Sequence, residues 1–110
     1  MITTHVLDLA LGRPAAGVPI LLERATAHGW DVIGAGLTDA DGRLRTLIPA
    51  GAPVVLGRHR LRFDTAAYFA ATGQTGFYPY VEVVFDLGGA GHAHVPLLLS
   101  PFGYSTYRGS

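Results

Sequence analysis

The 110 residues are enough for one domain, spanning residues 1–110, and leave no room for a second hydrophobic core. Hydrophobic residues make up 49% of the chain and charged residues 15%, a composition that excludes disorder and predicts a packed globule. Eight arginines balance eight acidic residues, whereas nucleic-acid-binding proteins normally carry a basic excess, so we expect no nucleic-acid partner.

The first half of the chain predicts strands separated by turns. Four segments have the alternation or the apolar content of strands: residues 3–10, 18–25, 30–38 and 43–47. The segments between them are rich in Gly, Pro, Asp and Ala and are predicted to be breaks or turns: residues 11–17, 26–29, 39–42 and 49–53.

The second half adds three strands and the one helix. Residues 59–64, 80–87 and 92–100 predict strands, and residues 88–91 a turn. The segment DTAAYFAATG predicts a helix, because Asp64 or Thr65 can cap its start, alanines favour its interior and Gly73 can end it. Seven or eight strands with one short helix indicate an all-β fold, and a β-sandwich is the leading class.

No apolar run reaches the roughly 18 residues that a membrane helix needs, so we expect no membrane partner. The first residues lack the pattern of a signal peptide, and the absence of cysteine excludes disulfides and a thiolate nucleophile. These features favour a cytoplasmic protein.

Two sequence patterns are predicted to be structural only. The segment GAGLTDADG lacks the third glycine of a dinucleotide-binding loop, and its DADG part lacks the closing glutamate of a calcium loop. We interpret it as a turn. Arg58, Arg60 and Arg62 alternate along a predicted strand and are expected to form one solvated face, with His28 and His59 as turn and surface residues.

The histidines are the main candidates for chemistry. His92 and His94 point to the same face of a predicted strand, opposite the apolar Val95, and this spacing is equally compatible with a metal site, a catalytic site and a polar face. His5 shares a face with Thr3 and leucines, where a core histidine is the commoner role. Catalysis becomes the better interpretation only if His5 and His94 face one cavity.

The chain resembles, end to end, the transthyretin-like 5-hydroxyisourate hydrolases of urate breakdown. The resemblance is carried by THVLDLALGRPAAGVP, TDADGR, FYPYVEVVF and HVPLLLSPFGYSTYRGS, and above all by the terminal YRGS. It implies a sandwich of two four-stranded sheets with a short helix after the fifth strand. It also implies a homotetramer, a dimer of dimers whose edge strands pair, with active sites in the channel between the dimers.

The resemblance further implies an enzyme that hydrolyses 5-hydroxyisourate to 2-oxo-4-hydroxy-4-carboxy-5-ureidoimidazoline without a cofactor or a metal. Water would attack a cyclic amide carbonyl with the help of histidine. The implied catalytic residues are His5, Arg43, His94 and Ser110. The implied substrate-binding residues are His5, Arg43 and Tyr107, and we add His92 as a residue that shapes the pocket.

A non-catalytic small-molecule carrier, as transthyretin is, remains the alternative. A carrier favours an apolar channel, so two histidines and an arginine argue against it. A metal site at His92 and His94 would need a third ligand nearby.

Overall fold

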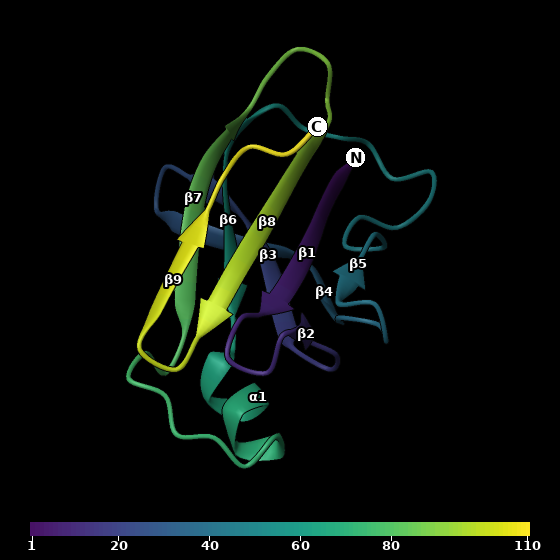
Figure 1. Cartoon of the computed structure of the whole chain (residues 1–110). Helices are drawn as coiled ribbons and strands as arrows, with labels where there is room; N and C mark the ends of the chain where they lie inside the picture. Colours follow the sequence, from purple (N-terminus) through teal and green to yellow (C-terminus); the bar gives the residue numbers. More distant parts are fainter.

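A computed structural model describes all of residues 1–110, which form two β-sheets with one helix at one end (Figure 1). The first sheet contains β1 (Ile2–Asp8), β2 (Arg13–Pro14), β5 (Arg43–Leu44), β8 (Ala93–Ser100) and β9 (Gly103–Thr106). The second contains β3 (Pro19–Thr26), β4 (Gly29–Leu37), β6 (Gly57–Phe63) and β7 (Val81–Leu87). The helix α1 (Thr65–Ala71) follows β6. The predicted all-β sandwich with one short helix is therefore confirmed.

The strand order of the first sheet places β1, near the start of the chain, beside β8, near its end. In the first sheet the order is β2-β1-β8-β9, and β5 also pairs with β1. β1 and β8 run parallel, whereas every other strand pair is antiparallel. The second sheet has the order β4-β3-β6-β7.

Three local predictions were wrong. The segment predicted as a break at residues 11–17 contains β2, so the first sheet has five strands instead of four. Pro14 is compatible with β2 because this strand pairs only with β1 and lies at a sheet edge. The segment 43–47 forms a strand only at its first two residues. The segment after residue 100, to which no strand was assigned, contains β9, whose largely exposed side chains give no apolar alternation.

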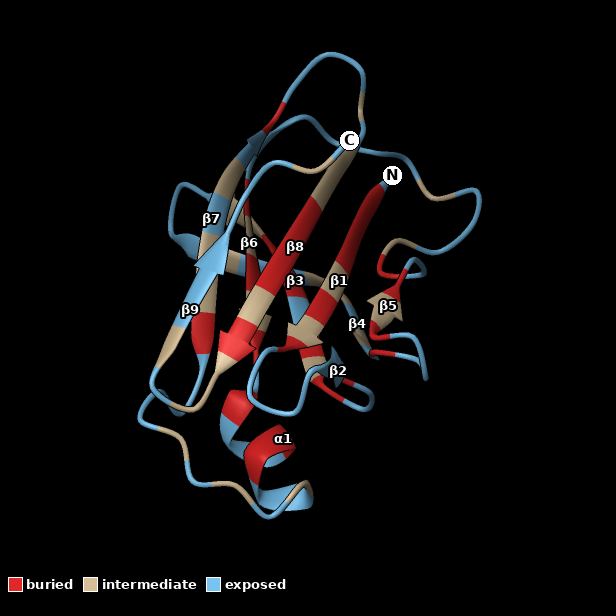
Figure 2. Cartoon of the chain, in the orientation of Figure 1, coloured by how far each residue is buried: buried red, intermediate tan, exposed pale blue.

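Strand alternation places the core as predicted. Val95, Leu97 and Leu99 of β8 are at most 6% exposed and face the second sheet, whereas His94 lies on the opposite face. In β1, Val6 is fully buried and His5 is only half-buried. Figure 2 shows long buried stretches in β1 and β8 and a largely exposed β9. The outer face of the first sheet is therefore free to carry polar chemistry without disturbing the core.

The helix is fixed at its start by a cap and at one side by a buried carboxylate. Asp64 caps α1 by accepting a hydrogen bond from Ala67 N at 3.1 Å. Asp8, at the end of β1, is buried and accepts hydrogen bonds from the Tyr68 hydroxyl (2.6 Å), Gln74 Nε2 (3.1 Å) and Leu11 N (2.9 Å). This carboxylate therefore ties α1 to the strand that carries His5.

Burial raises the pKa of the Asp8 carboxyl, but the hydrogen bonds from Tyr68, Leu11 and Gln74 outweigh burial and hold the pKa below its usual 3.8. An Asp8→Asn substitution puts an N–H group against one of these donors and is expected to lower the free energy of unfolding by about 1.5–3 kcal/mol. Because the folded pKa is depressed, the contribution of Asp8 is complete above pH 3.8 and is lost as the pH falls through the lower, folded pKa. Urea unfolding of the native protein and of Asp8→Asn, at neutral pH and at low pH, measures the difference in the free energy of unfolding. A difference that persists unchanged at low pH would contradict the role of the Asp8 carboxylate.

His59 is buried, and the prediction of a surface residue was wrong. His59 has the same strand parity as Leu61 and therefore points inward, where its Nδ1 lies 2.8 Å from Gly57 O and its ring stacks on Phe85. No helix of the structure is long and apolar enough to cross a membrane.

The arginines of β6 lie on its outer face and pair with acids of neighbouring strands. Arg58 contacts Asp86 at 2.9 Å, and Arg60 contacts Glu23 at 2.9 Å. These arginines are exposed or half-buried, as the alternation predicted, but they are compensated by acidic partners.

Candidate active site

Strand pairing brings the predicted residues together around β1. In the antiparallel pair of β1 and β5, His5 lies opposite Arg43, and in the parallel pair of β1 and β8, Thr3 lies opposite His94. The two histidines and the arginine, which are far apart in the sequence, thus share the outer face of one sheet. The position of His5 on this face overturns the core-histidine interpretation.

The DADG turn is structural, as predicted, but it also positions Arg43. The Asp39 carboxylate accepts hydrogen bonds from the backbone N–H groups of Asp41 (2.9 Å) and Arg43 (3.0 Å). The bond from Arg43 is the main reason that the pKa of Asp39 lies below its usual value. Gly42 has φ +74° and accepts a hydrogen bond from Val6 N at 2.8 Å, and a Cβ here would collide with the Val6 carbonyl oxygen. The turn is thereby docked onto β1.

The same turn orients His5. The Nε2 atom of His5 lies 2.9 Å from the carbonyl oxygen of Asp41. A carbonyl oxygen can only accept a hydrogen bond, so Nε2 carries a proton and Nδ1 is the nitrogen left for other contacts.

A cavity of about 140 Å³ opens on this face and has no apolar residue in its lining. Its lining consists of Thr3, Thr4, Arg43, Arg45, His92, His94 and Ser110. Four of the predicted site residues therefore meet in one cavity. His5 does not line it, so the condition that His5 and His94 face one cavity is not met, although His5 is paired with Arg43 beside the cavity.

His94 has the most constrained ring of the site. Its Nδ1 lies 2.8 Å from Thr3 Oγ1. Burial lowers the pKa of His94 below its ordinary 6.5, and the positive charges of Arg43, His5, His92 and Arg45 lower it further. His94 is therefore neutral at neutral pH and can accept a proton.

The C-terminal tail folds back over His94. Gly109 pairs with His94 as a β-bridge, and its N–H donates to the His94 carbonyl oxygen at 2.9 Å. A Cβ at position 109 would lie 2.5 Å from His94 Cδ2, so only glycine leaves this ring undisturbed. The bridge delivers the next residue, Ser110, into the polar cavity.

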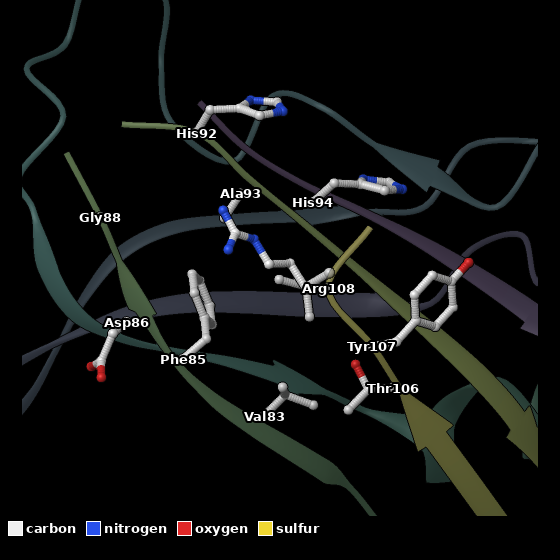
Figure 3. Close-up of a pocket in the computed structure, with 11 residues that line it drawn as sticks. Val83, Phe85, Asp86, Gly88, His92, Ala93, His94, Thr106, Tyr107 and Arg108 are labelled. Atoms are coloured by element: carbon white, nitrogen blue, oxygen red, sulfur yellow. The ribbon is translucent and has the colours of Figure 1, made fainter. Parts of the chain in front are cut away.

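A second cavity of about 360 Å³ lies between the edges of the two sheets (Figure 3). Its lining consists of Val83, Phe85, Asp86, Gly88, His92, Ala93, His94, Val95, Thr106, Tyr107 and Arg108. Figure 3 shows the Arg108 side chain extending towards Phe85 and Ala93, and the Tyr107 ring leaving the tail in the other direction. Tyr107 is 57% exposed. His92 and His94 line both cavities and so lie where the two meet.

Sequence reasoning missed Arg45 and gave no role to Thr3. The signal was available for both, because Arg45 has the same strand parity as Arg43, and Thr3 the same parity as His5.

The structure brings together no group of three or more His, Asp or Glu side chains that could hold a metal ion.

Comparisons with known proteins agree with this geometry. The model of the HIUase/Transthyretin family matches residues 2–109. The 5-hydroxyisourate hydrolase of Mus musculus is 46% identical over 112 residues, which cover 99% of this chain and 94% of that protein.

Two solved structures share the fold over nearly the whole chain. The structure of Klebsiella pneumoniae 5-hydroxyisourate hydrolase has a TM-score of 0.85 at 36% identity, covering 99% of this chain and 92% of that one. Sea bream transthyretin in complex with thyroxine has a TM-score of 0.88 at 39% identity, covering 98% of this chain and 93% of that one. With its full-length family match and these relatives, the chain belongs to the HIUase/Transthyretin family.

Proposed function

We propose that the chain acts as one hydrolase domain over residues 1–110 that converts 5-hydroxyisourate to 2-oxo-4-hydroxy-4-carboxy-5-ureidoimidazoline in urate degradation. The observation that carries this proposal is the wholly polar cavity, in which Arg43, His94 and Ser110 meet beside His5. Relatives named 5-hydroxyisourate hydrolase, from bacteria to mouse, support the same activity.

The reaction adds water to a cyclic amide carbonyl and breaks the ring C–N bond. We assign His94 as the base, because burial and its cationic neighbours hold it neutral. His94 takes a proton from water as the water oxygen bonds to the carbonyl carbon, a role worth about 10²–10⁴-fold in rate.

The carbonyl oxygen gains negative charge in this step, and Arg43 stabilises it. One such donor contributes about 10²–10³-fold. When the C–N bond breaks, the leaving nitrogen takes the proton that His94 removed from water, and the former amide carbonyl becomes a carboxylic acid that releases its proton to solvent. His5, whose Nε2–H is donated to the Asp41 carbonyl, offers its free Nδ1 as a hydrogen-bond acceptor to the substrate. Ser110 and His92 hold the substrate from the cavity wall, and Tyr107 covers it from the side of the second cavity.

A carrier function is the second candidate, favoured by the likeness to thyroxine-bound sea bream transthyretin. The cavity argues against it. A hydrophobic ligand gains little from a lining of arginine, histidine, threonine and serine.

We further propose that the protein is a cytoplasmic homotetramer, a dimer of dimers. The edge strands β7 and β9 end their sheets on the same side of the molecule (Figure 1), and such edges pair readily with a second copy. The polar cavity lies on the outer face of the first sheet, where a second dimer would enclose it.

The test is to add freshly prepared 5-hydroxyisourate and to follow the decay of its ultraviolet absorbance with and without protein. We expect decay well above the spontaneous rate and no measurable thyroxine binding by calorimetry. Decay at the background rate together with tight thyroxine binding would favour the carrier.

Turnover is expected to be unchanged after dialysis against EDTA, because His92 and His94 have no third ligand beside them. The measurement is the same absorbance assay before and after dialysis. Loss of activity that zinc restores would instead assign these two histidines to a metal site.

A further inference from the structure

We propose that Thr3 is a positioning residue for His94: its hydroxyl accepts a hydrogen bond from Nδ1–H and so leaves the Nε2 lone pair free to accept the proton of the attacking water. The catalytic consequence rests on the proposed function above. The placement of the proton within the ring is a separate claim that can be tested without substrate.

The geometry of the pair comes directly from the sheet. Thr3 and His94 are register partners in the parallel ladder of β1 and β8, so their side chains stand next to each other on one face. Thr3 Oγ1 lies 2.8 Å from His94 Nδ1, and Thr3 is only 8% exposed. The hydrogen bond is therefore shielded and is not readily replaced by water.

The two ring nitrogens of His94 have different surroundings. Nδ1 is occupied by Thr3, whereas Nε2 has no partner within the protein. Nε2 is nevertheless open to solvent, because the only buried side-chain nitrogen or oxygen without a partner is His59 Nε2. His94 lines both cavities, so Nε2 is the nitrogen that a water or a substrate atom can reach.

The direction of the Thr3 bond decides whether His94 can act as a base. If the hydroxyl donated to Nδ1, the neutral ring would carry its proton on Nε2, and its free lone pair would face Thr3 instead of the cavity. If the hydroxyl accepts from Nδ1–H, Nε2 takes the proton from water, and the Nδ1–H bond to Thr3 persists in the imidazolium. The Thr3 hydroxyl proton then points to the polar cavity, which Thr3 also lines.

Gly109 completes the positioning of the ring. Its backbone lies so close to His94 that a Cβ there would meet Cδ2 at 2.5 Å and Cγ at 3.3 Å. The ring is held at Nδ1 by Thr3 and along its Cδ2 edge by Gly109, which leaves little freedom for a flip that would exchange the nitrogens.

The first experiment reads the tautomer in the native protein. Long-range ¹H–¹⁵N correlation spectra at neutral pH distinguish the two neutral forms of each histidine, and the spectrum of His94→Gln assigns the His94 signals. We expect the proton on Nδ1. A proton on Nε2 of His94 would overturn the proposal, whatever the activity of the protein.

The second experiment compares three variants. Thr3→Val keeps the shape but loses the hydroxyl, and kcat is expected to fall by about 10–100-fold, the size of the effect when partners that orient metal-binding histidines are removed, with KM little changed. The His94 proton is expected to move to Nε2. Thr3→Ser restores the hydroxyl and is expected to return kcat to within a few-fold of the native value.

Thr65→Val is the matched control, since Thr65 is also buried and its hydroxyl donates to a backbone carbonyl, that of Tyr78, at 2.7 Å. It is expected to lose stability but to keep kcat and the His94 tautomer. A normal kcat in Thr3→Val, or a Thr3→Ser as impaired as Thr3→Val, would overturn the proposal. If Thr3→Val does not fold, the native spectrum decides.

Discussion

Replacing His94 by alanine is expected to lower kcat for 5-hydroxyisourate hydrolysis by about 10²–10⁴-fold, the contribution of a general base. The fold should survive, because the His94 side chain lies on the outer face of β8 and is absent from the hydrophobic core. His5→Ala and Arg43→Ala are expected to have large effects as well, with about 10²–10³-fold for the loss of the arginine as an oxyanion donor. Steady-state kinetics measure the loss of kcat, and the thermal midpoint measures whether the fold survives.

The pH dependence separates the role of His94 from that of a mere binding residue. Its pKa lies below the ordinary 6.5, so the neutral, proton-accepting form is lost only as the pH falls through this lowered value. In the native protein kcat/KM is therefore expected to rise on an acid limb below pH 6.5 and to be level at neutral pH. His94→Ala should lose this limb.

The exposed turn residue His28 provides the control for these substitutions. His28→Ala is expected to keep both the rate and the pH profile. A near-normal kcat in His94→Ala would contradict the assignment of the base, and unfolding of the variant would mean that His94 supports the sandwich instead.

Removal of Tyr107–Ser110 is expected to lower kcat by at least about 10²-fold, the order of loss that follows when a catalytic group is misplaced by about 1 Å. The truncation removes Ser110 from the polar cavity and takes away the Gly109 bridge that holds His94. The thermal midpoint should change little, since none of the last four residues belongs to the hydrophobic core.

Gly109→Ala tests the same idea without shortening the chain. Its new Cβ would strike the His94 ring, so kcat should fall while the other tail residues remain in place. Normal turnover in the truncated chain would show that the tail is dispensable. Normal turnover in Gly109→Ala alone would limit the role of the tail to its side chains.

Strand parity was the most informative property of the sequence. It placed Val95 and Leu97 inside and His94 outside, and the structure agrees. Parity also applied to Arg45, but a guanidinium two residues beyond Arg43 looks the same in sequence whether it faces a cavity or solvent. Arg45 lies one residue beyond β5, and only the folded structure shows that it lines the cavity.

The failures have a common physical reason. β2, β9 and the Gly109 bridge are held by partners distant in the sequence, not by local propensity. His59 is a different case: it has the strand parity of Leu61 and Phe63, so the alternation already placed it inside, and its assignment to the surface did not use that parity. Four of the seven residues that line the polar cavity were predicted from the sequence, but neither its shape nor the contact of Thr3 with His94 was.

The parallel pairing of β1 with β8 has a consequence for biosynthesis. β1 ends at Asp8, and its partner begins only at Ala93. At roughly 5–20 residues per second, a ribosome needs about 4–17 s to make the chain between them. During this time the edge of β1 that pairs with β8 has no partner, although β2 and β5 can already pair with its other edge. A nascent chain therefore keeps one edge of β1 unpaired until synthesis is almost complete, and an unpaired strand edge is a site at which chains can associate.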